Sequence, residues 1–211
     1  MFLVFEGLDG SGKSSLMRSL EERLNQDQIS FHRTREPGGT PLGDEIREMI
    51  LRTQGPNPVP RAELLLYEAS RAQHVDHVIR PKLASGEWVL CDRFAASSVA
   101  FQGGGREISE ADVVMLNLFA TGGLEADLTV LLDLSVEESR KRRQSRGAAL
   151  GESEDRIESE ADDFHEKVRQ SFLKQARAGE AKWLVLDASK TPQELSAELL
   201  QALIARGFLK A

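Results

Sequence analysis

The feature that most restricts the fold of this chain is the segment GLDGSGKS at residues 7–14, which matches the pattern G-x-x-x-x-G-K-[S/T]. The apolar residues 2–5 precede it, and Leu16, Leu20 and Leu24 follow it at helical spacing. Glycines let such a loop wrap around a polyphosphate and turn several N–H groups inward, while the helix N-terminus adds positive potential. The segment is therefore predicted to bind nucleotide phosphates between a strand and a helix.

Two side chains of this loop are expected to carry its chemistry. Lys13 would reach the β- and γ-phosphates of ATP, and Ser14 would place its hydroxyl on Mg²⁺. The residues predicted to cradle the nucleotide are Gly7, Leu8, Asp9, Gly10, Ser11, Gly12, Lys13 and Ser14. GTPases, motor ATPases and small-molecule kinases share this loop, so it does not fix the reaction.

Short apolar runs alternate with amphipathic stretches along the chain. The runs predicted to be buried strands are residues 2–5, 29–34, 88–91, 128–133 and 183–187. This alternation predicts an α/β fold of the P-loop NTPase type, with a five-stranded, mostly parallel sheet and helices on both faces. Residues 62–84 are expected to form a helix, and residues 36–40, 55–60 and 103–106 to form loops. No repeat or linker divides the sequence, so a single domain over residues 1–211 is expected.

Composition narrows the classes of function. The net charge of -7 is unfavourable for nonspecific nucleic-acid binding, which needs a basic footprint. No apolar run approaches the roughly 20 residues of a membrane span, and the short apolar N-terminus is expected to be a strand and not a signal peptide. The single cysteine, Cys91, is typical of a reducing compartment. A cytoplasmic protein without membrane or nucleic-acid partners is expected.

A second group of polar residues points to a second phosphate. The predicted strand at residues 88–91 ends in Asp92 and Arg93. An acid at such a strand end commonly supports Mg²⁺ beside the phosphate loop, and an arginine there can hold another phosphate through two hydrogen bonds. Tyr67 and Arg71 lie four residues apart, which places a ring and a guanidinium on one helix face. Such a face can stack on a base and read its edge, although an aromatic at this spacing more often belongs to the core.

Together these segments resemble the thymidylate kinase (dTMP kinase) family in its bacterial form, across nearly the whole chain. The matching segments are the phosphate loop with Asp9, TREPGGT at 34–40, EIR at 45–47, Tyr67 with Arg71, the DRF…SS…AFQG stretch at 92–103, residues 127–133, and RG at 146–147 with DRIE at 155–158. The resemblance implies a kinase that phosphorylates dTMP to dTDP with Mg-ATP, for dTTP synthesis, and that forms a homodimer.

The resemblance also implies roles for individual residues. Asp9 would lie between donor and acceptor as a catalytic residue with Lys13 and Arg93, and Mg²⁺ would be held by Ser14 and Asp92. Tyr67, where the family usually has phenylalanine, would stack on thymine. Residues implied to bind dTMP are Asp9, Glu36, Pro37, Arg47, Tyr67, Arg71, Arg93, Ser98, Phe101 and Gln102. The family often has tyrosine where this chain has Phe101, so a hydroxyl near the sugar is missing.

A lid is expected at about residues 140–158, with an insertion at 148–154. Phosphoryl transfer needs a cation on the migrating group. In one branch of the family that arginine lies in the phosphate loop, but this chain has Gly10 there. The expected source is therefore the lid, and Arg146 leads over Arg142 and Arg156.

Three alternatives remain open at the level of sequence. The chain could be a P-loop kinase with another pyrimidine or a small phosphorylated acceptor. It could be a nucleotide-responsive regulatory module without catalysis, although Lys13, Ser14, Asp92 and Arg93 are intact. The basic cluster at residues 140–146 could bind nucleic acid, which the acidic net charge disfavours.

Overall fold

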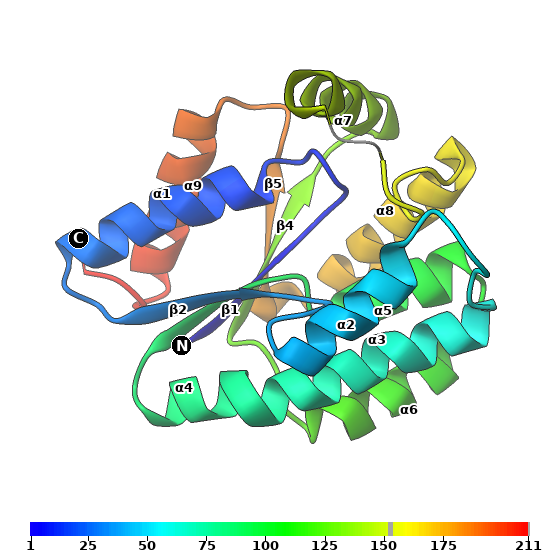
Figure 1. The fold of residues 1–211 in the computed structure, drawn as a ribbon. Helices are drawn as coiled ribbons and strands as arrows, with labels where there is room; N and C mark the ends of the chain where they lie inside the picture. The colour runs from blue at the N-terminus through cyan, green and yellow to red at the C-terminus, as the bar shows by residue number, and fades with distance from the viewer. Residues whose placement is uncertain (152–153, 211) are drawn as a thin grey trace.

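The computed structural model describes residues 1–151 and 154–210 of the chain. Its centre is a five-stranded sheet in the order β2-β3-β1-β4-β5 (Figure 1). All four pairings between neighbouring strands are parallel. The strands are β1 (Phe2–Glu6), β2 (Phe31–Arg35), β3 (Trp88–Asp92), β4 (Leu128–Asp133) and β5 (Trp183–Asp187). The predicted α/β class and the five strands are confirmed, with the start of β2 two residues later than expected.

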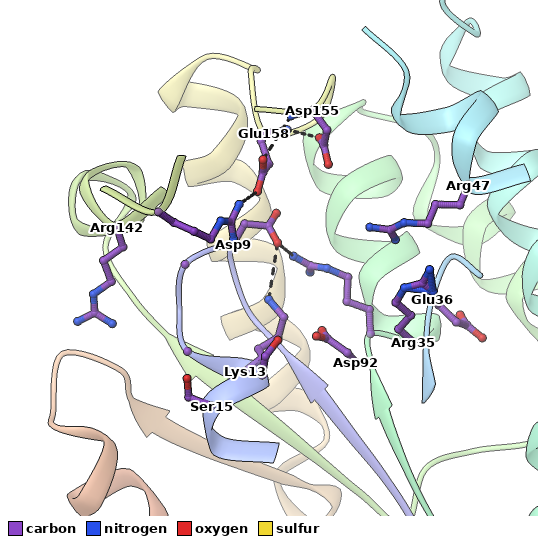
Figure 2. Close-up of a pocket in the computed structure, with 15 residues that line it drawn as sticks. Asp9, Lys13, Ser15, Arg35, Glu36, Arg47, Asp92, Arg142, Asp155 and Glu158 are labelled. Carbon is purple, nitrogen blue, oxygen red and sulfur yellow. Dashed lines mark hydrogen bonds and ion pairs between the residues drawn. The ribbon is translucent and has the colours of Figure 1, made fainter. Parts of the chain in front are cut away.

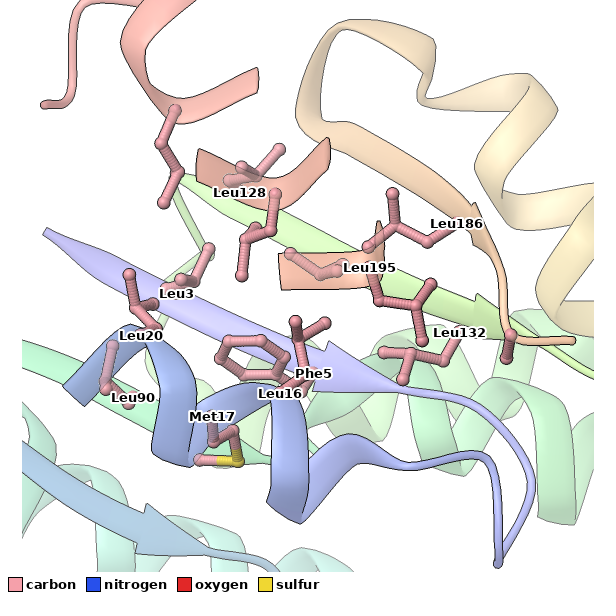
Figure 3. Packing of buried hydrophobic residues seen from close by; sticks show 14 of the residues in the cluster. Leu3, Phe5, Leu16, Met17, Leu20, Leu90, Leu128, Leu132, Leu186 and Leu195 are labelled. Carbon is pink, nitrogen blue, oxygen red and sulfur yellow. The ribbon is translucent and has the colours of Figure 1, made fainter. Parts of the chain in front are cut away.

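Every residue of the central strand β1 is buried. Alternate β1 side chains point to opposite faces, so the sheet has an apolar core on each side. On one face, Leu3 and Phe5 pack with Leu20 of α1 (Lys13–Gln26) and Leu195 of α9 (Pro192–Ala205) (Figure 3). Burial of these apolar side chains attaches the helix behind the phosphate loop to the sheet.

The other face is covered by helices from the middle of the chain. Phe2 and Val4 pack against Val75 and Ile79 there. The remaining elements are α2 (Pro41–Leu51), α3 (Pro60–His74), η1 (Val75–Ile79), α4 (Arg80–Ala84), α5 (Ala95–Ser98), η2 (Val99–Gly105), α6 (Glu110–Thr121), α7 (Val136–Leu150), α8 (Asp162–Ala178) and η3 (Glu180–Lys182). Figure 1 shows α3, α4 and α6 together beneath the sheet, on the side away from α1 and α9. No helix in the described ranges has the length and apolar character to cross a bilayer.

The helix expected over residues 62–84 begins slightly earlier and contains a π-helical segment, η1. The Arg80 N–H bonds to the carbonyl of Val75, five residues back. Pro81 follows directly, and a proline lacks an N–H and clashes with the carbonyl four residues before it. We attribute the wider turn to this proline.

The loop predicted at residues 103–106 is wrong for its first three residues, since η2 continues in helical form through Gly105. The glycines serve close packing of η2 on α8. A Cβ atom on Gly104 would lie 2.9 Å from the Ser171 Cβ, and one on Gly105 would lie 2.4 Å from the Phe164 Cε2. Glycine here thus marks a tight contact between helices, which local sequence does not distinguish from a turn.

Candidate active site

The phosphate loop joins β1 to α1, as predicted. Its backbone adopts positive φ at Gly7, Gly10 and Gly12, and Gly12 caps the N-terminus of α1. A side chain at Gly7 would bring a Cβ atom to 2.5 Å from the Leu132 backbone oxygen, so the loop can approach β4 only with glycine there. The first N–H groups of a helix lack partners within the helix, so the start of α1 beside this loop favours an anion.

Beside this loop lies a cavity of about 660 Å³, which we call the donor cavity (Figure 2). Six cationic and five acidic side chains are among the residues that line it. The lining residues are Asp9, Gly10, Gly12, Lys13, Ser14, Ser15, Arg35, Glu36, Arg47, Asp92, Arg93, Arg142, Arg146, Asp155 and Glu158. This dense set of cations suits a polyphosphate.

Asp9, Lys13 and Arg93 form an ionic network in the lining of the donor cavity, and Figure 2 labels Asp9 and Lys13. The Arg93 Nη2 donates to the Asp9 Oδ1 at 2.8 Å, and the Lys13 Nζ lies 3.8 Å from the same oxygen. Burial raises the pKa of Asp9, but the charges of Arg93 and Lys13 outweigh it and hold that pKa well below its usual range. Burial and the neighbouring Arg93 lower the pKa of Lys13. Asp9 is therefore a carboxylate at neutral pH.

Arg93 has the left-handed backbone conformation, with φ 73°. This conformation is costly for a residue with a side chain and is often found at functional sites. Beneath it lies Glu6, which is fully buried and accepts hydrogen bonds from the N–H groups of Phe94 and Ser97 and from the Ser97 hydroxyl. Burial raises the pKa of Glu6 to about 7, against the opposing charge of Arg93. Glu6 thus fixes the segment that carries Arg93.

A second, smaller cavity of about 70 Å³ adjoins the first, and we call it the acceptor cavity. Its lining residues are Asp9, Glu36, Pro37, Arg47, Leu51, Tyr67, Arg93, Ser97, Phe101, Gln102, Asp155 and Ile157. Five of these, Asp9, Glu36, Arg47, Arg93 and Asp155, also line the donor cavity. The Arg93 Cζ lies 4.9 Å from the centre of the Phe101 ring, a cation–π distance. Eight of the ten residues expected to bind dTMP thus surround one cavity.

The other two, Arg71 and Ser98, are not among the described residues that line either cavity. Arg71 is 1% exposed, and its Nε donates to the Glu36 Oε2 at 2.8 Å. Its Nη1 donates to Glu68, Ser98 and Asn117, at 2.6, 2.8 and 2.7 Å. In this structure Arg71 is therefore a buried ion-pair partner of Glu36, and its contact with thymine stays a prediction.

The lid arginines point in different directions. Arg142 and Arg146 line the donor cavity, where the Arg146 Nη2 donates to the Glu158 Oε1 at 2.5 Å. Arg156 is turned away, because its Nε donates to the Ile50 backbone oxygen at 2.8 Å and its Nη2 to Glu63. Of the insertion expected at residues 148–154, residues 152–153 lie outside the described part of the chain.

Several residues of the site were not singled out from the sequence. Arg35, Asp155 and Glu158 line the donor cavity, and Glu6 lies beneath it. Arg35 adjoins the predicted loop at residues 36–40, and its place at the end of β2 could have indicated it. Glu6 could also have been recognised from the sequence, because it is an acidic residue at the end of an apolar strand, directly before the phosphate loop.

A glycine-rich phosphate loop between β1 and α1, a parallel sheet and a cavity rich in cations define a P-loop protein of the kinase type, with a second cavity adjoining the one beside the loop. Residues 5–199 match the sequence profile of the thymidylate kinase family. The chain belongs to this family, as the sequence motifs indicated.

Several similar proteins are named thymidylate kinase. One from Bdellovibrio bacteriovorus is 75% identical over 208 residues, covering 99% of this chain and 97% of that protein. One from Clavibacter michiganensis subsp. michiganensis is 46% identical over 210 residues, covering 98% and 97%. One from Geotalea daltonii is 42% identical over 207 residues, covering 97% of each chain.

Proposed function

We propose that this chain transfers the γ-phosphoryl group of ATP to dTMP, giving dTDP and ADP for dTTP synthesis. The observation that supports this best is the shared wall of the two cavities. Asp9, Arg47 and Arg93 line both of them, so a donor phosphate at the loop and an acceptor phosphate would meet among these side chains. Holding two reactants in line can remove ~7–11 kcal/mol of barrier.

The roles of the acceptor side follow from the lining of its cavity. Arg47 and Arg93 would hold the phosphate of dTMP, with charge-assisted hydrogen bonds. Tyr67 would stack on the thymine ring, and Gln102 would meet its edge. Gln102 is already oriented, because its Nε2 donates to the Glu63 Oε1 at 3.0 Å.

Catalysis in this site would consist mainly of charge neutralisation. Lys13 now bonds to the backbone oxygens of Gly7 and Leu8, each at 3.2 Å, and its ammonium would exchange these for the β- and γ-phosphates of ATP. Asp9 would keep Arg93 aligned at the boundary between the cavities. Cys91 is buried, burial raises the pKa of its thiol, and it has no part in the reaction proposed here.

Ser14 and Asp92 would hold Mg²⁺, since both line the donor cavity. Their hydroxyl and carboxylate oxygens are the hard donors that Mg²⁺ prefers, with waters and phosphate oxygens supplying the other ligands. Within residues 1–151 and 154–210, no three His, Cys, Asp or Glu side chains gather as a metal site. Bound Mg²⁺ would neutralise charge on the β- and γ-phosphates.

We propose that a lid arginine stabilises the migrating phosphoryl group, and that Arg146 is that residue, with Arg142 as the alternative. Both line the donor cavity, whereas Arg156 is held by Ile50 and Glu63. Separate alanine variants at positions 142 and 146 should distinguish the two, since the true residue is worth ~10³–10⁵ in kcat.

A homodimer is also part of the proposal. The exposed side of α6 carries Val114, Met115, Leu118 and Phe119, with 50%, 57%, 63% and 84% of their surfaces accessible. Large apolar side chains gathered on one helix commonly mark a protein contact. A second copy of the chain, packed on α6, would cover them.

The test is an ADP-release assay with Mg-ATP and the acceptors dTMP, dUMP, UMP, CMP, dCMP, AMP and GMP. Fast turnover with dTMP, alone or with weaker dUMP turnover, supports the proposal. Turnover with another acceptor instead would keep the phosphoryl transfer but overturn the roles given to Tyr67 and Gln102. Tight ATP binding without any turnover would favour a regulatory module. Salt-dependent binding of DNA would contradict the expectation of no nucleic-acid partner, and the cytoplasmic location likewise stays a prediction.

A further inference from the structure

Glu63, in the first turn of α3, orients Gln102, but none of the roles above explains why its buried carboxylate also binds two arginines. Its side chain is 1% exposed. Gln102 Nε2 donates to it at 3.0 Å, Arg106 Nε and Nη2 donate at 3.2 Å each, and Arg156 Nη2 donates at 2.6 Å. Burial raises the pKa of Glu63, but hydrogen bonds from Arg106, Gln102 and Arg156 outweigh it and hold the pKa below its ordinary value. Glu63 is thus a buried, fully bonded anion.

Two of these donors belong to separate segments that line the acceptor cavity. Gln102 lines the cavity from η2. Arg156 belongs to residues 154–160, which we call the lid arm, and the arm contributes Asp155 and Ile157 to the same cavity. One carboxylate therefore joins the wall that would meet the base to the segment that ends the lid.

The lid arm is attached at more than one point. The Arg106 Nη2, which bonds to Glu63, also lies 2.6 Å from the Glu160 Oε1. The Arg156 backbone N–H donates to the Leu51 oxygen at 3.2 Å, and Leu51 lines the acceptor cavity too. Among these contacts Glu63 is the only group that bonds to both arginines, so its removal should loosen the arm most.

We propose that Glu63 is a positioning residue that holds the lid arm over the acceptor cavity and thereby sets the affinity for the acceptor. The proposal rests on the function proposed above. The phosphate loop, α1 and α7 make no hydrogen bond to Glu63 within the described residues. Loss of Glu63 should therefore weaken acceptor binding and leave ATP binding nearly unchanged. A loosened arm should also admit water, which raises ATP hydrolysis without acceptor.

The test compares Glu63→Gln, Arg156→Gln and the double variant in the ADP-release assay. Each single variant should raise the KM for dTMP about tenfold or more, as expected for a charge-assisted hydrogen bond in a buried site. The effect of the double variant should fall clearly short of the sum of the two single effects, because both substitutions break the same Glu63–Arg156 ion pair. Arg140→Gln is the matched control, since Arg140 forms an exposed lid ion pair with Asp162 and should change both KM values by less than about twofold.

Hydrogen exchange supplies a readout that does not need turnover. Addition of dTMP should protect residues 154–160 in the wild type and protect them less in both variants. Three results would overturn the proposal. Equal increases in the KM for ATP and for dTMP would mean a general structural effect, additive effects in the double variant would mean that Glu63 and Arg156 act independently, and unchanged protection would mean that Glu63 does not hold the lid arm.

The same variants also cover two further outcomes. If Glu63→Gln does not fold, Arg156→Gln carries the test, because it leaves Glu63 bonded to Arg106 and Gln102. If wild-type protein does not phosphorylate dTMP, the proposed function fails first. The variants are then assayed with the acceptor that the wild type uses, and the same KM comparison decides the role of Glu63.

Discussion

The Arg93→Ala substitution removes the guanidinium that lies between the donor and acceptor cavities. In the structure the Arg93 Nη2 is 2.8 Å from the Asp9 Oδ1, and the Nη1 is 3.9 Å from the Glu6 Oε2. The side chain is only 14% exposed, so these contacts are weakly screened by water. The substitution should therefore affect both catalysis and stability, by amounts that can be separated.

For catalysis we expect kcat to fall by ~10³-fold or more, the range found when a cation on the transferred phosphoryl group is lost. ATP affinity should fall by less than tenfold, or about 1.4 kcal/mol, because Lys13 and the loop N–H groups remain. For stability, removal of one partner of a buried ion pair costs ~3–5 kcal/mol. The cost here should lie near the lower end, since Asp9 keeps Lys13 at 3.8 Å and the raised pKa of Glu6, about 7, lets it take up a proton.

The assay combines steady-state kinetics, calorimetric ATP binding and urea unfolding, with two companion variants. Arg93→Lys keeps the charge and loses the planar fork, so its kcat should lie between those of wild type and Arg93→Ala. Arg93→Gly should be as inactive as Arg93→Ala but more stable by about 1 kcal/mol, because glycine adopts the φ of 73° without strain.

Two results would refute this reasoning. A loss of ATP affinity as large as the loss of kcat would mean that Arg93 supports the donor loop and not the transfer. Retention of more than about a tenth of the wild-type kcat would mean that its charge is not needed on the migrating group.

Three further predictions test packing, pH dependence and assembly. Gly105→Ala should lower the free energy of unfolding by ~1–3 kcal/mol, because its Cβ would lie 2.4 Å from the Phe164 ring, whereas Gly103→Ala, with its nearest neighbours at 3.9 Å, should be nearly neutral in the same urea titration. Glu6 should make stability fall as pH rises from about 4.5 to about 7, because its pKa is raised on folding and the folded state then binds more protons than the unfolded state. The expected loss is about 3 kcal/mol, and urea unfolding of Glu6→Gln across this range should show a correspondingly flatter profile; equal slopes would contradict it. Phe119→Glu should convert a dimer into a monomer in light scattering, and an unchanged mass would place the dimer contact elsewhere or exclude it.

Much of the fold can be predicted from short segments of the sequence. The glycine pattern at residues 7–14, the apolar strands and the helical spacing of Leu16, Leu20 and Leu24 each report their own structure, because backbone sterics and burial act over a few residues. The same local patterns placed Asp92 and Arg93 at a strand end, where the structure has them lining the donor cavity. Family motifs supplied the acceptor residues, which spacing alone could not.

The direction of a charged side chain is decided by partners that are distant in sequence. Arg156 and Glu63 are 93 residues apart, and their ion pair turns Arg156 away from the phosphate loop while Arg142 and Arg146 face it. The same holds for Arg71, whose buried acceptors come from several elements.

Local sequence also could not tell a turn from a close helix contact. Gly103, Gly104 and Gly105 resemble a loop in the sequence, but the approach of α8 makes them part of a helix. By itself the sequence determined which strands and loop form and which residue types meet at the end of the sheet. Only the tertiary structure decided which of those side chains face the cavities. A buried charge is costly unless it is paired, so its direction depends on partners that other parts of the fold provide.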